Sequence, residues 1–208
     1  VFVYAQSAWA WVLAAAGAYL LGSVSGAIIA SFTRHGEDIR QFGSGNAGLT
    51  NALRTYGVAN AVLVAVIDLG KTVLAILLAR WLLGSVWGLV IGGGFAVVGH
   101  VRPVYYHFRG GKGVLCCTAI VALLDLRLLA AAAAVFALAV ACTRTVSIGS
   151  LSAAAAAPIF CLLLKEGTVY TLFVTGLCIA LFWMHRSNIS RILRGEEKPT
   201  AIAKRRKP

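Results

Sequence analysis

Residues 57–79 read GVANAVLVAVIDLGKTVLAILLA, and they indicate what kind of protein this is. The stretch has 23 residues and is apolar at most positions. About 20 mostly apolar residues are enough for an α-helix to cross the hydrocarbon core of a bilayer. Residues 57–79 therefore predict a transmembrane helix.

Similar apolar segments follow one another along the chain, which is 60% hydrophobic and 12% charged. We predict an all-α polytopic membrane protein with about seven transmembrane helices, forming one domain over residues 1–208. The fourth and fifth segments are short and rich in alanine, with only Asp125-Leu-Arg127 between them. Five or six spans are therefore the alternatives. The seven segments are 9–32, 57–79, 81–99, 112–126, 128–143, 147–164 and 167–184.

The basic residues are distributed unevenly between the connections. Fifteen of the nineteen Lys and Arg lie in residues 33–56, 100–112, 144–146 and 185–208. Cytoplasmic loops of membrane proteins carry such an excess. The pattern predicts an external N-terminus, a cytoplasmic C-terminus and a basic cytoplasmic tail from about residue 192. The placement also accounts for the net charge of +12 without a nucleic-acid partner.

A polar, glycine-dense stretch, FGSGNAGLTN at residues 42–51, interrupts this apolar pattern. Lipid cannot satisfy free backbone N–H groups, so the stretch must face water or line a cavity. Glycines let several N–H groups converge on an anion, and a nearby arginine adds counter-charge. We predict a phosphate or carboxylate site. Its candidate residues are Gly43, Ser44, Gly45, Asn46, Thr50, Asn51 and Arg54.

Two charges lie within the segment 57–79, at Asp68 and Lys71. At a spacing of three residues they share one helix face and can pair. Charges at this depth normally face a protein interior or a water-filled cavity. The alternatives are an internal salt bridge that fixes helix packing and a direct role in the site. Between them, Gly70 is expected to let another helix approach closely.

A second candidate anion motif is GGKG at residues 110–113, shortly after His100. It is not a Walker A loop, because Tyr106 and Gly113 stand where that motif needs glycine and Ser or Thr. A lysine between glycines at a helix start is still well placed to bind an anion. The candidate residues here are His100, Gly110, Gly111, Lys112 and Gly113.

Two more polar clusters lie at residues 144–150 and 185–191. They contain Ser147 and Ser150 in the first, and His185 and Asn188 on one helix face in the second. All four clusters flank predicted cytoplasmic ends of spans and are poor in carboxylates. That composition favours one or two phosphates and no metal, since a divalent cation needs several anionic oxygen ligands.

Taken in order, these clusters resemble the bacterial acyl-phosphate:glycerol-3-phosphate acyltransferase family (PlsY) over roughly residues 17–197. The resemblance implies a multi-pass enzyme of the bacterial cytoplasmic (inner) membrane with its active site on the cytoplasmic side. It would move a fatty acyl group from acyl phosphate to the 1-hydroxyl of glycerol 3-phosphate, without a cofactor. The matching residues are Gly43–Asn46, Thr50, Asn51, Arg54, Asp68–Lys71, Gly99, His100, Pro103, Phe108, Gly110–Val114, Arg144, Ser147, Ser150, His185, Arg186 and Asn188.

Roles follow from the needs of that reaction. We expect Ser44, Gly45 and Asn46 to cradle the acyl-phosphate headgroup. We expect Arg54, Lys112 and Ser150 to hold glycerol 3-phosphate, with Ser147 as the alternative hydroxyl. His185 and Asn188 would orient the acceptor hydroxyl.

The general base stays open at this point. Within the matched motifs, the base candidates are His100 and His185, and neither has an evident carboxylate to orient it. A phosphate oxygen of the donor is the alternative, which we favour. Two other functions are a transporter of phosphorylated metabolites and a non-catalytic lipid-binding protein. The clusters at one membrane face and the lack of a visible inverted repeat disfavour the transporter.

Overall fold

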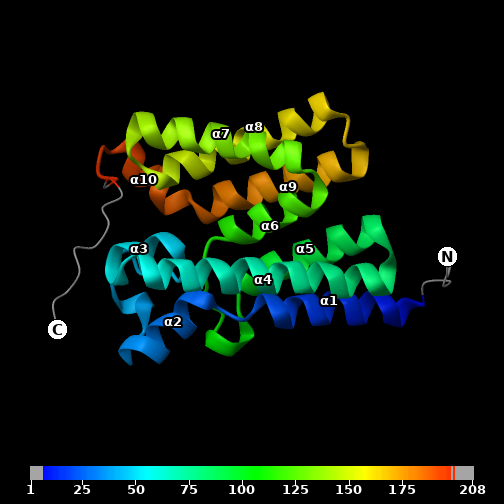
Figure 1. Ribbon diagram of the computed structural model, residues 1–208, viewed down its shortest axis with the longest axis horizontal. Helices are drawn as coiled ribbons and strands as arrows, with labels where there is room; N and C mark the ends of the chain where they lie inside the picture. The colour runs from blue at the N-terminus through cyan, green and yellow to red at the C-terminus, as the bar shows by residue number, and fades with distance from the viewer. Residues whose placement is uncertain (1–6, 198, 200–208) are drawn as a thin grey trace. The chain divides into compact units, whose positions relative to one another are not determined.

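The computed structural model describes residues 7–197 and 199, and the described chain is helical without strands (Figure 1). The all-α prediction is confirmed. The basic segment 204–207 of the predicted tail lies outside the described residues. Each of the seven predicted apolar segments contains a helix.

The chain groups into two compact units, one up to Leu123 and one from Leu124 onward. The prediction of one domain over the whole chain stays a prediction. The first unit contains α1 Ala8–Gly22, α2 Gly26–His35, the 3-10 helix η1 Ile39–Gln41, α3 Leu49–Tyr56, α4 Val58–Leu83, α5 Ser85–Val101, the 3-10 helix η2 Val104–Tyr106 and all but the last residue of α6 Val114–Leu124. The second contains α7 Leu126–Thr143, α8 Val146–Leu164, α9 Thr168–Met184 and α10 Arg186–Leu193.

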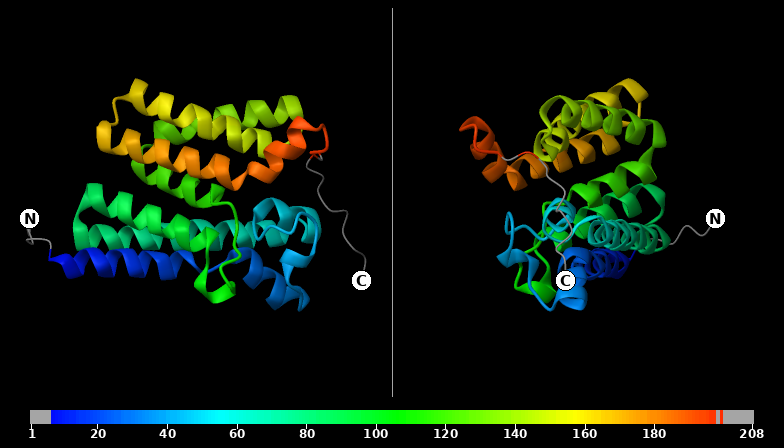
Figure 2. Two further views of the ribbon diagram at one scale, coloured as in Figure 1. Left: turned by 180° about the vertical axis from the view of Figure 1, so that it is seen from behind. Right: turned by 60° about the vertical axis from the view of Figure 1, so that its left-hand side comes forward.

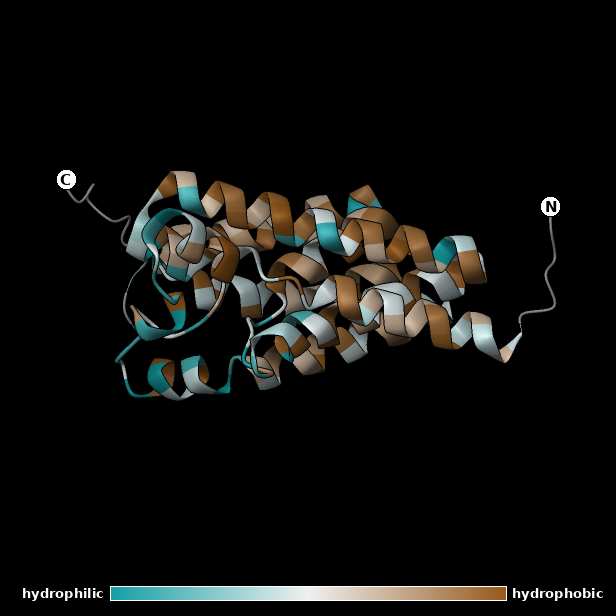
Figure 3. Ribbon diagram, turned by 90° about the horizontal axis from the view of Figure 1, so that it is seen from below, coloured by the Kyte–Doolittle hydropathy of each residue, from teal (hydrophilic) through white to brown (hydrophobic). Residues whose placement is uncertain are grey.

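Several of these helices are long and apolar enough to cross a membrane, and hydrophobic residues cover them (Figure 3). Among the described residues there are five such spans: Ala8–His35, Val58–Leu83, Val86–Tyr106, Leu126–Thr143 and Val146–Leu164. The pair α9 and α10, bent by 60°, is long and apolar enough to be a sixth when the two helices are taken as one span. The helix α6 has 11 residues, and at about 1.5 Å per residue it is shorter than a bilayer core. The count of seven and the orientation of the termini stay predictions.

Helices α1, α4 and α5 pack side by side through small residues (Figures 1 and 2). Along α1, Ala14, Ala18 and Gly22 recur every fourth residue, and all three are buried. A methyl group added at Gly22 would lie 2.4 Å from the carbonyl oxygen of Ala96 in α5. Such contact between backbones is the usual means of association for apolar helices, which gain nothing from excluding water inside lipid.

The close approach expected at Gly70 is not found. Apart from the adjacent backbone of α4 itself, no described atom lies within 4 Å of the place a methyl group would occupy there. Gly92 has this role at the α4–α5 contact, since its added methyl would lie 2.8 Å from the Ala75 carbonyl oxygen. A glycine's spacing from charged residues does not reveal which helix face it occupies relative to a neighbour.

The first apolar segment is interrupted between Gly22, where α1 ends, and Gly26, where α2 begins. Buried charged side chains of α4 form hydrogen bonds with the backbone groups of this break. Asp68 Oδ1 accepts a hydrogen bond from the Gly26 N–H at 3.1 Å. Lys71 Nζ donates to the carbonyl oxygen of Val24. A backbone break inside an apolar layer leaves polar groups that lipid cannot pair, so these two side chains take the place of water.

The same two charges hold the end of α5. Lys71 Nζ lies 2.9 Å from Asp68 Oδ1 and 2.9 Å from His100 Nδ1. Asp68 is 1% exposed, and Lys71 and His100 are each 5% exposed. The internal salt bridge is therefore present, with His100 as its third member. A direct contact of these residues with substrate stays a prediction.

We expect Gly22→Ala to destabilise the first unit, because its methyl group meets backbone rather than a movable side chain. Overpacking of this kind costs about 1–3 kcal/mol. The matched control is Gly70→Ala, which adds the same methyl group where space is open. Thermal unfolding in detergent should show a lower Tm for Gly22→Ala and an unchanged or higher Tm for Gly70→Ala. Equal Tm values would contradict the packing described.

Removing one partner of the Asp68–Lys71 pair should destabilise the protein strongly. An uncompensated buried charge costs about 3–5 kcal/mol. Asp68→Ala and Lys71→Ala should each lower the free energy of unfolding. In a double-mutant cycle in detergent, the double variant should lose less than the sum of the two single losses. Arg127→Ala is the control, since that arginine side chain is 70% exposed in its ion pair with Asp125. Additive losses at Asp68 and Lys71 would show that the pair is not coupled.

Candidate functional site

The loop between Gly43 and Gly48 is shaped by Asn51, which lies beneath it in the first turn of α3. Asn51 Oδ1 accepts from the Ser44 N–H at 3.0 Å, and its Nδ2 donates to the Phe42 carbonyl at 3.0 Å and the Ile39 carbonyl at 3.3 Å. Asn51 is 2% exposed. These contacts give it the role of holding the loop, and its predicted contact with substrate stays a prediction.

The loop turns on two glycines with left-handed backbone. Gly43 has φ of 60° and Gly45 has φ of 71°, a region that side chains with a Cβ rarely adopt. Ser44 between them is exposed, and Asn46 is partly buried. The loop thus presents a hydroxyl and an amide on a fixed backbone.

The helix α3 begins directly after this loop, at Leu49, with Gly48 as its N-cap. The N–H groups of a first helical turn have no partner within the helix and favour an anion. Thr50 lies in that turn, and Arg54 lies one turn further on. Arg54 is partly buried and forms no ion pair with any described residue. Its charge is therefore available to a ligand of this loop.

The second glycine loop packs directly against the first. A methyl group added at Gly111 would lie 2.6 Å from the Ala47 carbonyl oxygen and 2.2 Å from His100 Nε2. The N–H groups of Gly110 and Gly111 bind the carbonyls of Val101 and His100, at 3.3 and 3.1 Å. Gly111 therefore has no room for a side chain. The contact brings the Ser44–Asn46 loop beside the segment that contains Lys112.

Lys112 is partly buried and stands two residues before α6. Gly113, with φ of 87°, makes the turn into that helix. As predicted, a lysine between glycines precedes a helix N-terminus. His100 lies behind Gly111 and in contact with Lys71, so it supports this loop from the protein interior.

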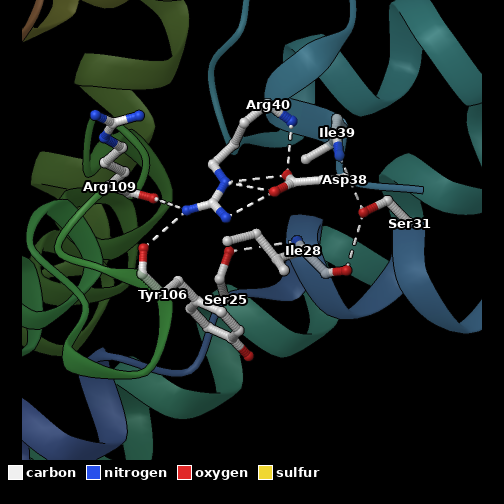
Figure 4. Close-up of polar contacts among 8 residues, drawn as sticks. All are labelled: Ser25, Ile28, Ser31, Asp38, Ile39, Arg40, Tyr106 and Arg109. Carbon is white, nitrogen blue, oxygen red and sulfur yellow. Dashed lines mark hydrogen bonds and ion pairs between the residues drawn. The ribbon is translucent and has the colours of Figure 1, made fainter. Parts of the chain in front are cut away.

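An arginine that the sequence reasoning missed joins these segments (Figure 4). Arg40 forms an ion pair with Asp38 at 2.6 Å, and its third nitrogen, Nη1, donates to the carbonyls of Tyr106 at 2.8 Å and Arg109 at 3.2 Å. Hydrogen bonds from this guanidinium hold the pKa of Asp38 below its usual value. Asp38 thus stays charged and keeps Arg40 extended across both segments.

The segment that carries Arg40 is itself attached to α2. The Ile39 N–H donates to Ser31 Oγ at 3.3 Å, and that hydroxyl donates to the Ile28 carbonyl at 2.9 Å (Figure 4). The sequence signal for Arg40 was a carboxylate, Asp38, two residues before it. The ion pair between Asp38 and Arg40 could have been recognised from this spacing. The hydrogen bonds from Arg40 to the carbonyls of Tyr106 and Arg109, which we call the Arg40 clamp, could not.

In the second unit, Ser147 and Asn188 come together. Asn188 Nδ2 donates to Ser147 Oγ at 2.7 Å. Both also bind Glu197, whose Oε1 accepts from Ser147 Oγ at 2.7 Å and from Asn188 Nδ2 at 2.6 Å. Arg191 Nε pairs with the other oxygen at 2.6 Å. Sequence reasoning placed Ser147 and Asn188 in the site but missed Arg191 and Glu197.

Ser150 and His185 lie one turn from this cluster along their helices, and both are buried. Ser150 Oγ donates to the Val146 carbonyl of its own helix at 3.0 Å. His185 Nδ1 lies 2.8 Å from the Leu181 carbonyl oxygen. In the neutral ring this contact places the proton on Nδ1 and the lone pair on Nε2.

Comparisons with known proteins identify the family of this chain. A family model described as glycerol-3-phosphate acyltransferase matches residues 12–195. A protein of that name from Hydrogenovibrio crunogenus is 39% identical over 183 residues, covering 88% of each chain. Another, from Halalkalibacterium halodurans, is 41% identical over 188 residues, covering 87% of this chain and 91% of the relative.

Solved structures give the same result. The crystal structure of PlsY, an integral membrane glycerol 3-phosphate acyltransferase, in its glycerol 3-phosphate form has a TM-score of 0.84 and 31% identity, covering 92% of this chain and 96% of that one. Its lysophosphatidic acid form has a TM-score of 0.80 and 28% identity, over 91% and 94% of the chains. The prediction of a multi-pass membrane protein is thereby confirmed. With its paired glycine loops and this degree of similarity, the chain belongs to the glycerol-3-phosphate acyltransferase family.

Proposed function

We propose that this protein transfers a fatty acyl group from acyl phosphate to the 1-hydroxyl of glycerol 3-phosphate, giving lysophosphatidate (1-acylglycerol 3-phosphate) and inorganic phosphate. The observation that carries the proposal is the contact between two anion-suited loops, at Ala47 and Gly111. The activity of the relatives supports glycerol 3-phosphate as the acceptor and an acyl group as the group that is transferred. The acyl-phosphate donor is our inference from the chemistry of these loops.

The donor proposal rests on what the loops offer and what they lack. The loop at Ser44 and Asn46 presents hydrogen-bond donors with little charge, and Lys112 beside it adds a cation. Acyl phosphate is a mixed anhydride with a good leaving group, so transfer needs orientation and charge stabilisation more than a covalent nucleophile. A phosphate on the donor would use these groups directly.

The step itself forms one bond and breaks one. The acceptor hydroxyl oxygen attacks the acyl carbonyl carbon, and the bond from that carbon to the phosphate oxygen breaks. Phosphate leaves with the electron pair. We assign the donor headgroup to Ser44, Gly45 and Asn46, and the charge of glycerol 3-phosphate to Arg54 and Lys112. Lys112 near a developing negative charge would stabilise the transition state.

The acceptor proton has two destinations, a phosphate oxygen of the donor and His185 Nε2. His100 is disfavoured, since it is 5% exposed and its Nδ1 contacts Lys71. The remaining roles are those expected above: Ser150, with Ser147 as alternative, binds glycerol 3-phosphate, and Asn188 orients the hydroxyl. The apolar helices would hold the acyl chain, and the reaction would take place at the cytoplasmic face of the inner membrane.

The direct test is an assay of purified protein with acyl phosphate and radiolabelled glycerol 3-phosphate. We expect labelled lysophosphatidate and one phosphate released per acyl group transferred. Acyl-CoA offered instead of acyl phosphate should give none. Product from acyl-CoA alone would replace the proposed donor, and no product from either donor would reject the proposed function.

Single substitutions test the two loops. Lys112→Ala should lower kcat/KM by about 100-fold or more, the usual cost of losing one charge-stabilising group in an active site. Ser44→Ala should lower it by about 10-fold through a lost hydrogen bond of about 1.4 kcal/mol. The controls are Lys165→Ala and Ser187→Ala, which remove an exposed lysine and an exposed serine outside the loops. Near-full activity of both loop variants, with unchanged Tm, would refute the site.

His185→Gln separates the two proton acceptors. If donor phosphate takes the proton, the variant should keep measurable turnover with a raised KM for glycerol 3-phosphate. Abolished turnover with unchanged glycerol 3-phosphate binding, measured by calorimetry, would make His185 the base.

A further inference from the structure

The segment before Lys112 contains a turn with costly backbone. His107 has φ of 56° and Phe108 has φ of 57°, so two successive residues with side chains adopt the left-handed conformation. A residue with a Cβ enters this region at a cost, and then usually alone. In the described chain, the other such residues are Arg144 and Lys165, each alone at the C-cap of an α-helix. The turn at 107–108 therefore needs contacts that hold it.

The Arg40 clamp binds this turn on both sides (Figure 4). Arg40 Nη1 donates to the carbonyl oxygen of Tyr106, just before the turn, at 2.8 Å, and to that of Arg109, just after it, at 3.2 Å. The carboxylate of Asp38 accepts from the other two nitrogens, Nε and Nη2, at 2.6–3.0 Å. The guanidinium thus has one nitrogen for the turn, and Asp38 fixes where that nitrogen points.

Side-chain packing contributes little to the turn itself. His107 and Phe108 are both exposed. A cleft beside the turn is lined by Asp38, Arg40, Gln41, His107 and Arg109. Arg102, from the same segment, adds one bond of 3.3 Å to the Phe108 carbonyl from an exposed side chain. The Arg40 clamp is therefore the turn's link to the segment that leads into the Gly43–Gly48 loop.

The turn leads directly to Lys112. Gly110 and Gly111 follow Arg109, and Lys112 comes next. Both glycine N–H groups bind carbonyls at the end of α5. The direction in which the chain leaves the turn therefore determines where the lysine side chain begins. In an active site, a displacement of about 1 Å can cost about 100-fold in rate.

We propose that Arg40 is a positioning residue for Lys112, because its clamp keeps the preceding turn in left-handed backbone. The Gly43–Gly48 loop does not depend on the clamp in the same way, since Asn51 holds it from beneath. Arg40 therefore acts on what Lys112 does and not on the donor headgroup. The inference rests on the proposed function, in which Lys112 binds glycerol 3-phosphate and stabilises the transition state.

Kinetics of Arg40→Gln test this division. The variant should lower kcat/KM for glycerol 3-phosphate by about 10-fold or more and leave the KM for acyl phosphate unchanged. The control is Arg34→Gln, which removes the same charge from an exposed position at the end of α2 and should have no effect. In a Lys112→Ala background, Arg40→Gln should cost less than about 2-fold more, because the clamp acts through that lysine. Independent losses in the double variant would overturn the proposal.

Glycine at position 107 tests how the clamp acts. In the Arg40→Gln background, His107→Gly should recover at least about 5-fold of the lost kcat/KM, because glycine adopts left-handed backbone without the cost that a Cβ brings. His107→Ala is the matched control, since it removes the same imidazole but keeps the Cβ, and it should recover nothing. Equal activity of the two variants in that background would show that the clamp does not act through the turn.

Amide hydrogen exchange gives a readout that needs no activity. In Arg40→Gln, the amides of residues 108–112 should exchange faster than in the parent protein, whereas those of residues 43–51 should not. Unchanged exchange at 108–112 would overturn the proposal. If Arg40→Gln does not fold, as judged by its Tm, Arg40→Lys serves instead, because it keeps the charge opposite Asp38 but lacks the planar fork.

These outcomes are separate from the proposed function. An inactive parent protein rejects the acyltransferase. An active parent whose Arg40 variants are fully active rejects this inference alone.

Discussion

The ion pair between Asp68 and Lys71 connects three parts of the first unit, α4, the break between α1 and α2, and the end of α5. Its oxygen and nitrogen atoms replace water at the break between α1 and α2, through Gly26 and Val24. Lys71 also contacts His100, the residue on which Gly111 packs. One buried pair thus connects an interrupted membrane helix to the backbone of a glycine loop. Because its members are almost wholly buried, their cost in desolvation is offset only when every partner is in place. The polar loops are therefore positioned from the apolar interior.

Close packing positions the helices of the first unit, and polar contacts position its loops. The helices α1, α4 and α5 approach through glycine and alanine, which fixes the distance between backbones. Above them, directed polar contacts fix the loops: Asn51 beneath the first loop and Arg40 across to the second. The absence of a side chain at Gly111 then lets the two loops touch, since a Cβ there would lie only 2.6 Å from the Ala47 carbonyl oxygen. Residues that contact a phosphate can therefore be few, because others hold the backbone that presents them.

The sequence was enough to predict the helical class, the apolar segments and the two glycine loops, because each depends on local composition. Hydropathy found every long helix, and the glycines at 43 and 45 marked a backbone that other residues rarely adopt. Long-range partners could not be read in this way. Nothing in the pattern tells that Lys71 reaches His100, that Asn51 faces inward, or that Glu197 meets Ser147 fifty positions away. The predicted close approach at Gly70 was wrong for the same reason, because the sequence does not show which face of a helix lies against a neighbouring helix.

The clamp made by Arg40 binds carbonyl oxygens of Tyr106 and Arg109 and no side chain of either residue. Every amino acid has a backbone carbonyl, so these hydrogen bonds do not depend on which side chains stand at the two positions. The exposed side chain at 109 is thereby free to diverge while its backbone keeps its course, whereas Tyr106 also packs against the core cluster that contains Ile28 and Ile39. By contrast, Asp38 and Arg40 can change only together, because each would leave the other's charge without a partner. Variation between relatives should accordingly fall on position 109, and constancy on the pair Asp38 and Arg40.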